Sequence, residues 1–249
     1  MPRALLVLSA LAIVVAACGG GSSAGDSTRA GETATLWVTR DRGAEVVLEK
    51  AVPAGSTALQ ALDREADVET RYGGRFVQAV DGIEGSLDAR RDWFYFLNGI
   101  EPDLGGADVT VHAGDVIWWD FRSWADTMAQ PVVVGAFPEP FLHGWDGKRR
   151  PADVRAPPEL ANEADALRRV LGGGDGTGDP NVFALRVEPG ADGAALTADR
   201  GAGNDSPVTF TLGGSLAAVR AAAAALARDP SIVRFRYEAR FDDDGNLAP

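Results

Sequence analysis

Cys18 is the only cysteine in the 249-residue chain, so no disulfide can form within the molecule. The folded part must therefore be held together by burying apolar side chains rather than by cross-links. The chain is long enough for two domains of ordinary size. Its formal net charge of −12 argues against a nucleic-acid partner, because phosphate groups would be repelled.

Cys18 stands at the end of an apolar leader that begins after Arg3. The apolar run suits a signal peptide and is too short to span a bilayer as one helix. Val15-Ala16-Ala17-Cys18 resembles the lipobox of bacterial lipoproteins, which implies a signal peptide over residues 1–17 and a lipid on Cys18. We therefore expect an anchor on the extracytoplasmic face of the cell membrane. The alternative is an ordinary cleaved signal with an incidental cysteine.

Residues 18–32 are rich in Gly and Ser and predict a flexible tether between the lipid and the folded part. Structured patterns begin at Thr33. The sequence predicts strands over Thr33–Asp41, Ala44–Val52, Arg75–Val80, Asp92–Leu97, Val109–Val111 and Val116–Ser123, with a short helix after Thr57. Turns are expected at Arg42-Gly43, Gly82, Asn98-Gly99 and Gly114-Asp115. This order, two strands followed by a helix and further strands, predicts an α+β domain in which one helix packs on a mixed sheet.

Several motifs of this region occur in the order found in one known family. They are Pro53-Ala54-Gly55-Ser56-Thr57-Ala58-Leu59, Phe76-Val77, Val80-Asp81-Gly82-Ile83, Trp93-Phe94-Tyr95-Phe96-Leu97-Asn98-Gly99 and Gly114-Asp115. Together they resemble the C-terminal β-domain of the transcobalamin and intrinsic-factor family, which bacterial lipoproteins carry as DUF4430. The resemblance implies a β-grasp-like domain over residues 33–127. It also implies a small-molecule ligand of the cobalamin type and a membrane importer as a partner.

Residues 128–249 predict a second, small α+β domain that matches no family known to us. Strands are expected over Gln130–Phe137, Asn181–Val187, Ala195–Ala198, Pro207–Leu212 and Ser231–Phe241, with a proline-rich loop over 137–158. Helices are expected over Glu159–Leu171 and after Ser215, the second with Leu216, Val219 and Leu226 on its inner stripe.

Groups suited to catalysis or metal binding are scarce. His112 and His143 are the only histidines, and neither has a second ligand at the spacing of a zinc site. Both are expected to be exposed turn residues. No serine nucleophile motif is present, so we expect no catalytic residues, no metal and no cofactor.

Aromatic residues of the first domain form the remaining candidate site. Alternation along Val116–Ser123 places Ile117, Trp119 and Phe121 on one face and Trp118, Asp120 and Arg122 on the other. The second face requires a partner, which is either the second domain or a ligand. The candidate ligand or partner surface comprises Trp93, Tyr95, Trp118, Asp120, Arg122 and Trp124.

These features favour a non-enzymatic, surface-anchored lipoprotein that binds a small molecule for delivery to an importer, a corrinoid if the resemblance extends to the ligand. The alternative is a structural or adaptor lipoprotein that binds another envelope protein through its aromatic face. A third reading, a hydrolase using two carboxylates, requires a close pair of acidic side chains in different environments, which sequence alone does not reveal.

Overall fold

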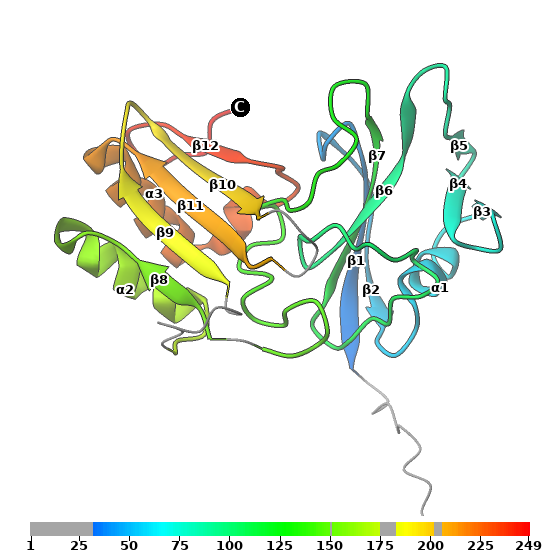
Figure 1. The fold of residues 1–249 in the computed structure, drawn as a ribbon, viewed down its shortest axis with the longest axis horizontal. Coiled ribbons are helices and arrows are strands. Elements are labelled where there is room, and N and C mark those ends of the chain that lie inside the picture. The colour runs from blue at the N-terminus through cyan, green and yellow to red at the C-terminus, as the bar shows by residue number, and fades with distance from the viewer. Residues whose placement is uncertain (1–31, 150, 175–182, 202–205) are drawn as a thin grey trace, which may run out of the picture.

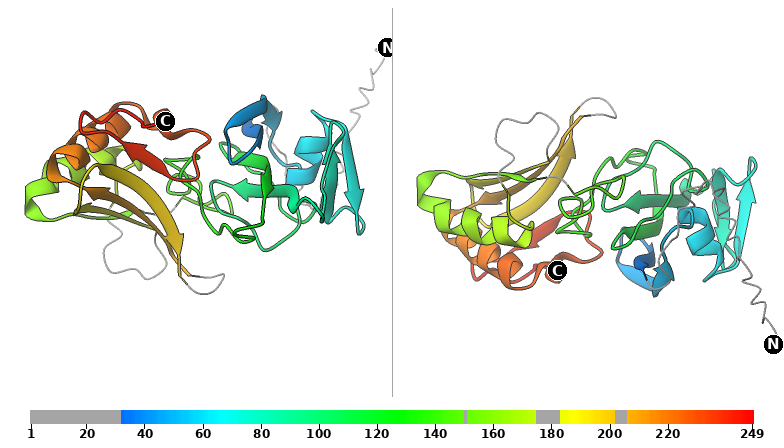
Figure 2. Two further views of the ribbon diagram at one scale, coloured as in Figure 1. Left: turned by 90° about the horizontal axis from the view of Figure 1, so that it is seen from above. Right: turned by 90° about the horizontal axis from the view of Figure 1, so that it is seen from below.

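The structure is a computed structural model that describes residues 32–149, 151–174, 183–201 and 206–249. Cys18, the signal peptide and nearly all of the predicted tether lie outside these residues. The two halves of the chain lie side by side, each with its own sheet (Figures 1 and 2). Within the described residues, no helix is both long and apolar enough to cross a membrane.

The first half is built on a four-stranded mixed sheet of order β2-β1-β7-β6, in which β1 and β7 are parallel. Its strands are β1 (Thr33–Arg40), β2 (Glu45–Pro53), β6 (Arg91–Leu97) and β7 (Val116–Ser123). A smaller antiparallel sheet contains β3 (Val68–Arg71), β4 (Phe76–Val80) and β5 (Ile83–Glu84). Helix α1 (Ala58–Asp63) packs between them and buries Ala58, Ala61 and Leu62 with Leu36 and Trp119.

The local signals of the first half are confirmed. Thr57 caps α1 through a capping box with Gln60, as its spacing predicts. Asn98 and Gly99 both adopt positive φ, at 52° and 80°, which is the backbone conformation of a type I′ turn. Gly82 and Gly114 also have positive φ in turns. Val109–Val111 forms no strand, because only Thr110 makes an isolated bridge, to Thr57.

Gly99→Val should destabilise the protein by about 1–3 kcal/mol, because a β-branched residue is strained at this positive φ. A Cβ at position 99 would also lie 2.8 Å from the carbonyl oxygen of Val133 in the second half. Gly73→Val is the matched control, since it has a similar φ of 71° but no atom within 4 Å of the added Cβ. Denaturant unfolding should show the larger loss for Gly99→Val, and equal losses would contradict the close contact with Val133.

The second half contains a five-stranded sheet of order β12-β10-β11-β9-β8. Its strands are β8 (Asp153–Arg155), β9 (Ala184–Pro189), β10 (Ala194–Arg200), β11 (Val208–Gly214) and β12 (Ala239–Phe241). One face is covered by η1 (Pro158–Leu160), α2 (Ala161–Val170) and α3 (Leu216–Arg228), as Figure 1 shows. Ser215 caps α3 as predicted, whereas Leu216 is exposed rather than part of the inner stripe.

Two strands predicted in the second half are wrong. Gln130–Phe137 is an irregular segment whose Val133 N–H donates to Gly99 O and whose Val134 N–H donates to Tyr237 O. Most of Ser231–Phe241 is also not a strand: η2 (Pro230–Val233) occupies its start, and only Ala239–Phe241 joins the sheet. In both segments some apolar residues, such as Val133 and Tyr237, pack between the two halves, and others, such as Val134 and Val233, join the core of the second half. Their periodicity therefore reflects burial rather than sheet pairing. Residues 181–182 of the predicted Asn181–Val187 strand lie outside the described residues.

Each half has a hydrophobic core of its own, and a third hydrophobic cluster joins the two halves. It contains Trp37, Phe96, Trp118, Val133, Ala136 and Tyr237, with Phe235 packed against it. The α+β class predicted from the sequence is confirmed. The β-grasp-like assignment and the exact boundary between residues 127 and 128 stay predictions.

Candidate functional site

The predicted aromatic surface is divided between the two faces of the first sheet. Trp93 and Tyr95 lie on the face toward α1, where Tyr95 stacks on Trp119 at a centroid distance of 4.7 Å. Their polar atoms are satisfied, since Trp93 Nε1 donates to Ile83 O at 2.8 Å and the Tyr95 hydroxyl to Leu104 O at 2.6 Å. Burial raises the pKa of Tyr95 well above its usual value. Both side chains therefore belong to the hydrophobic core of the first half.

Trp118, Asp120 and Arg122 lie on the opposite face and are completely buried. Asp120 accepts hydrogen bonds from Thr39 Oγ1 at 2.6 Å and from the Tyr237 hydroxyl at 2.8 Å. Burial and the adjacent Asp120 raise the pKa of Tyr237, so its hydroxyl stays protonated and donates. These contacts bind the second half to the first.

The guanidinium of Arg122 is held by contacts with the first half and with the segment that follows β7. Its guanidinium donates to Thr127 O at 3.0 Å and Met128 O at 2.6 Å, and lies 3.7 Å from the centre of the Phe94 ring. Trp124, the residue after β7, is half-buried. The six residues therefore form no single exposed surface. The second half covers the face that required a partner, which was one of the two explanations left open by the sequence.

Both histidines lie beside a buried polar network. Asp115 is completely buried and accepts from Asn98 Nδ2 at 2.7 Å, and the same amide nitrogen donates to Gly144 O at 2.6 Å. His143 Nδ1 lies 2.5 Å from Glu139 Oε1, and burial raises the pKa of that carboxyl while His143 opposes the shift. His143 is thus a half-buried loop anchor rather than the freely exposed turn residue expected. Among the described residues, no three His, Cys, Asp or Glu side chains are grouped to hold a metal ion.

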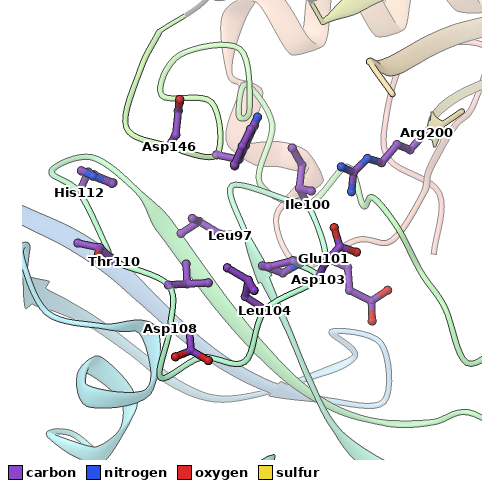
Figure 3. A pocket seen from close by; sticks show the side chains of 13 residues that line it. Leu97, Ile100, Glu101, Asp103, Leu104, Asp108, Thr110, His112, Asp146 and Arg200 are labelled. Atoms are coloured by element: carbon purple, nitrogen blue, oxygen red, sulfur yellow. The ribbon is translucent and has the colours of Figure 1, made fainter. Parts of the chain in front are cut away.

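A cavity of about 470 Å³ opens where the two halves meet (Figure 3). Its apolar wall contains Leu97, Ile100, Leu104 and Val109 from the first half and Trp145 from the proline-rich loop of the second. Leu104 and Trp145 are 58% and 55% exposed, which is unusual for such large apolar side chains.

A second hollow, of about 410 Å³, adjoins the cavity and shares Glu101, Pro102, Asp103 and Arg200 with it. Its apolar side chains include Phe94 and Met128, and Met128 is 60% exposed. We call the two together the interface groove. Another concavity, on the sheet of the second half, is lined by charged and hydroxyl side chains such as Arg155, Arg186 and Thr209 and offers no comparable apolar wall.

Sequence reasoning missed the interface groove. Its residues come from β6 and the turns that follow it (94–112), from 128–131, from 145–146 and from 200–201 at the end of β10. No periodicity links these segments. The one local signal is Trp145, a tryptophan in a proline-rich loop where no strand or helix pattern predicts a place in a core.

Residues 55–123 match the family model of DUF4430, a domain of unknown function. The first half carries a DUF4430 domain. This confirms the DUF4430 assignment made from the sequence motifs. The domain contributes side chains between Phe94 and His112 to the interface groove. No curated protein matches the chain.

Two solved structures are distantly similar. One is a candidate metal-binding protein from Ruminococcus gnavus ATCC 29149, 18% identical, with 37% of this chain aligned to 97% of that one at a TM-score of 0.31. The other is haptocorrin in complex with Cbi, 17% identical, with 36% of this chain aligned to 25% of that one at a TM-score of 0.30. The chain thus spans a quarter of the haptocorrin chain. At these TM-scores neither structure bears on the function.

Proposed function

We propose that the protein is a non-enzymatic lipoprotein, anchored through Cys18 on the extracytoplasmic face, that binds a small molecule in the interface groove for delivery to an importer. The observation that carries the proposal is the groove itself: an apolar cavity between the two halves, with a few polar side chains along it. Cavities of this size and position are the usual sites of small-molecule binding. A tether keeps such a binding module close to a membrane partner.

A corrinoid is the first ligand class to test, because the motifs of the DUF4430 domain resemble those of the transcobalamin family. The adaptor alternative relied on an exposed aromatic face, and that face is buried against Phe235 and Tyr237. Small-molecule binding is therefore favoured over capture of a protein by these residues.

Equilibrium dialysis of the mature protein against cobalamin and cobinamide should show saturable uptake of at least one of them. The double variant Leu104→Ala/Trp145→Ala should weaken this binding about tenfold or more, because each apolar side chain covered by a ligand contributes about 1–2 kcal/mol. Tyr72→Ala/Leu87→Ala is the matched control, since both residues are also large, exposed side chains and lie outside the groove. Uptake unaffected by the groove variant would contradict the proposed site, and no uptake of either compound would exclude a corrinoid.

The anchor is tested separately by Cys18→Ser. An alcohol does not replace the thiolate in forming the thioether, so the variant should lack the lipid. Mass spectrometry of the N-terminus and detergent partitioning would show the difference. An unmodified cysteine in the wild-type protein would refute the anchor without affecting the proposal for the groove.

A further inference from the structure

The interface groove has a marked excess of negative charge. Four carboxylates line it, those of Glu101, Asp103, Asp108 and Asp146, against the single guanidinium of Arg200. Figure 3 shows Glu101 and Asp103 next to each other, with Asp108 and Asp146 farther along the cavity. An uncharged apolar ligand would form no ion pair with these carboxylates.

Glu101 and Asp103 occupy the junction of the groove, because both line the cavity and the adjoining hollow. Glu101 Oε2 accepts from the backbone N–H of Gln130 at 2.7 Å. Among the described residues, no cation lies within 4.0 Å of either carboxylate. The junction therefore holds two adjacent acidic groups without a counter-ion of their own.

The pKa of Glu101 reflects the lack of a counter-ion at the junction. Burial raises the pKa of Glu101, and the negative charge of Asp103 acts in the same direction. The Gln130 N–H and the more distant Arg122 oppose the shift without cancelling it. A positive group placed at the junction would stabilise the ionised form of Glu101.

The two outer carboxylates, Asp108 and Asp146, each form an ion pair with a cationic side chain. Asp108 pairs with Arg75 at 4.0 Å and Asp146 with Lys148 at 3.9 Å, and both cationic side chains are more than three-quarters exposed. Ion pairs of such exposed side chains contribute little and are screened by salt. Asp108 therefore adds negative charge to the cavity beyond that of Glu101 and Asp103, and Arg200 contributes the one guanidinium of the lining.

Apolar surface lies on both sides of the acidic junction. Leu104 and Trp145 stand on the side of the cavity, and Phe94 and Met128 on the side of the hollow. A ligand bound here would place apolar parts against these side chains and a polar group at Glu101 and Asp103.

We propose that the ligand of the interface groove is an organic cation, with an apolar body on the groove walls and a protonated amine at Glu101 and Asp103. This inference rests on the proposed function, small-molecule binding in the groove, and it replaces the corrinoid as the expected ligand class, because a corrinoid carries amide side chains and no protonated amine. Charge-assisted hydrogen bonds to two carboxylates would fix the orientation of the amine, and the apolar walls would supply most of the buried area.

Three probes of equal length separate charge from apolar burial: phenylbutylamine, phenylbutanol and phenylbutyrate. Isothermal titration of the mature protein at low salt should give the amine about tenfold tighter binding than the alcohol, and the carboxylate the weakest. The double variant Glu101→Gln/Asp103→Asn should reduce the affinity for the amine to that for the alcohol. It should leave the affinity for the alcohol unchanged, which a merely misfolded variant would not do.

Glu69→Gln/Asp88→Asn is the matched control, because it removes the same charge from positions outside the groove. This control should retain the preference for the amine. Equal binding of amine and alcohol, or tighter binding of the carboxylate at Arg200, would refute the cationic ligand while leaving a small-molecule site in the groove. Binding of none of the three probes would refute both the cationic ligand and the apolar site on which it rests.

Discussion

Trp118→Ala should lower the free energy of unfolding of the mature protein by about 3–5 kcal/mol, the usual cost of removing a large buried aromatic side chain. Trp118 is completely buried between the two halves, with its ring centre 5.5 Å from that of Tyr237 and 6.0 Å from that of Trp37. Its Nε1 donates to Thr39 Oγ1 at 2.7 Å. The substitution therefore removes apolar contacts with both halves and one buried hydrogen bond.

Chemical denaturation followed by circular dichroism measures the loss. Trp145→Ala is the control for the same change of side chain at an exposed position, and should shift stability by only about 0.5 kcal/mol. Trp118→Phe should give an intermediate loss, because it retains a ring but not the hydrogen bond to Thr39. A Trp118→Ala variant as stable as Trp145→Ala would show that the two halves do not share a core in solution.

The second large effect is expected from Asp120→Ala, at about 2–5 kcal/mol, because each buried donor left without an acceptor costs about 1–3 kcal/mol. Asp120 accepts from the hydroxyls of Thr39 and Tyr237 and, at 3.1 and 3.3 Å, from the backbone N–H groups of Arg42 and Gly43. Its carboxylate thus connects the β1–β2 turn to the second half.

Tyr237→Phe is the matched variant for Asp120→Ala, since it removes one donor and keeps the carboxylate. We expect it to cost about 1–2 kcal/mol. Thermal unfolding of the two variants, with the wild type, gives the comparison. If Asp120→Ala is no less stable than Tyr237→Phe, the Asp120 carboxylate does not stabilise the contact between the β1–β2 turn and the second half.

Features that depend on a few neighbouring residues could be predicted from the sequence. The Thr57 capping box, the Asn98-Gly99 turn and the Ser215 cap each follow from a local conformational preference. The alternation along β7 correctly separates the Trp119 face from the Trp118 face, because side chains of a strand point to opposite sides.

What covers the Trp118 face could not be predicted, since two of the aromatic side chains that cover it, Phe235 and Tyr237, lie more than 100 positions later. The same long-range contact explains the two wrong strands. Gln130–Phe137 and Ser231–Phe241 carry apolar side chains at strand-like intervals, but tertiary packing, between the halves and in the core of the second half, determines their backbone. The interface groove depends on the same packing, so no single segment could reveal it.

The most direct test of the central claim is to locate a bound probe with the indole N–H signals of the six tryptophans. In an NMR titration with phenylbutylamine, the Trp145 signal should shift saturably, because Trp145 alone of the tryptophans lines the interface groove. The signals of Trp93, in the core of the first half, and of Trp118, buried between the two halves, should stay unchanged. A saturable shift of Trp118 or Trp124 with Trp145 unaffected, or no shift at all, would contradict binding in the groove.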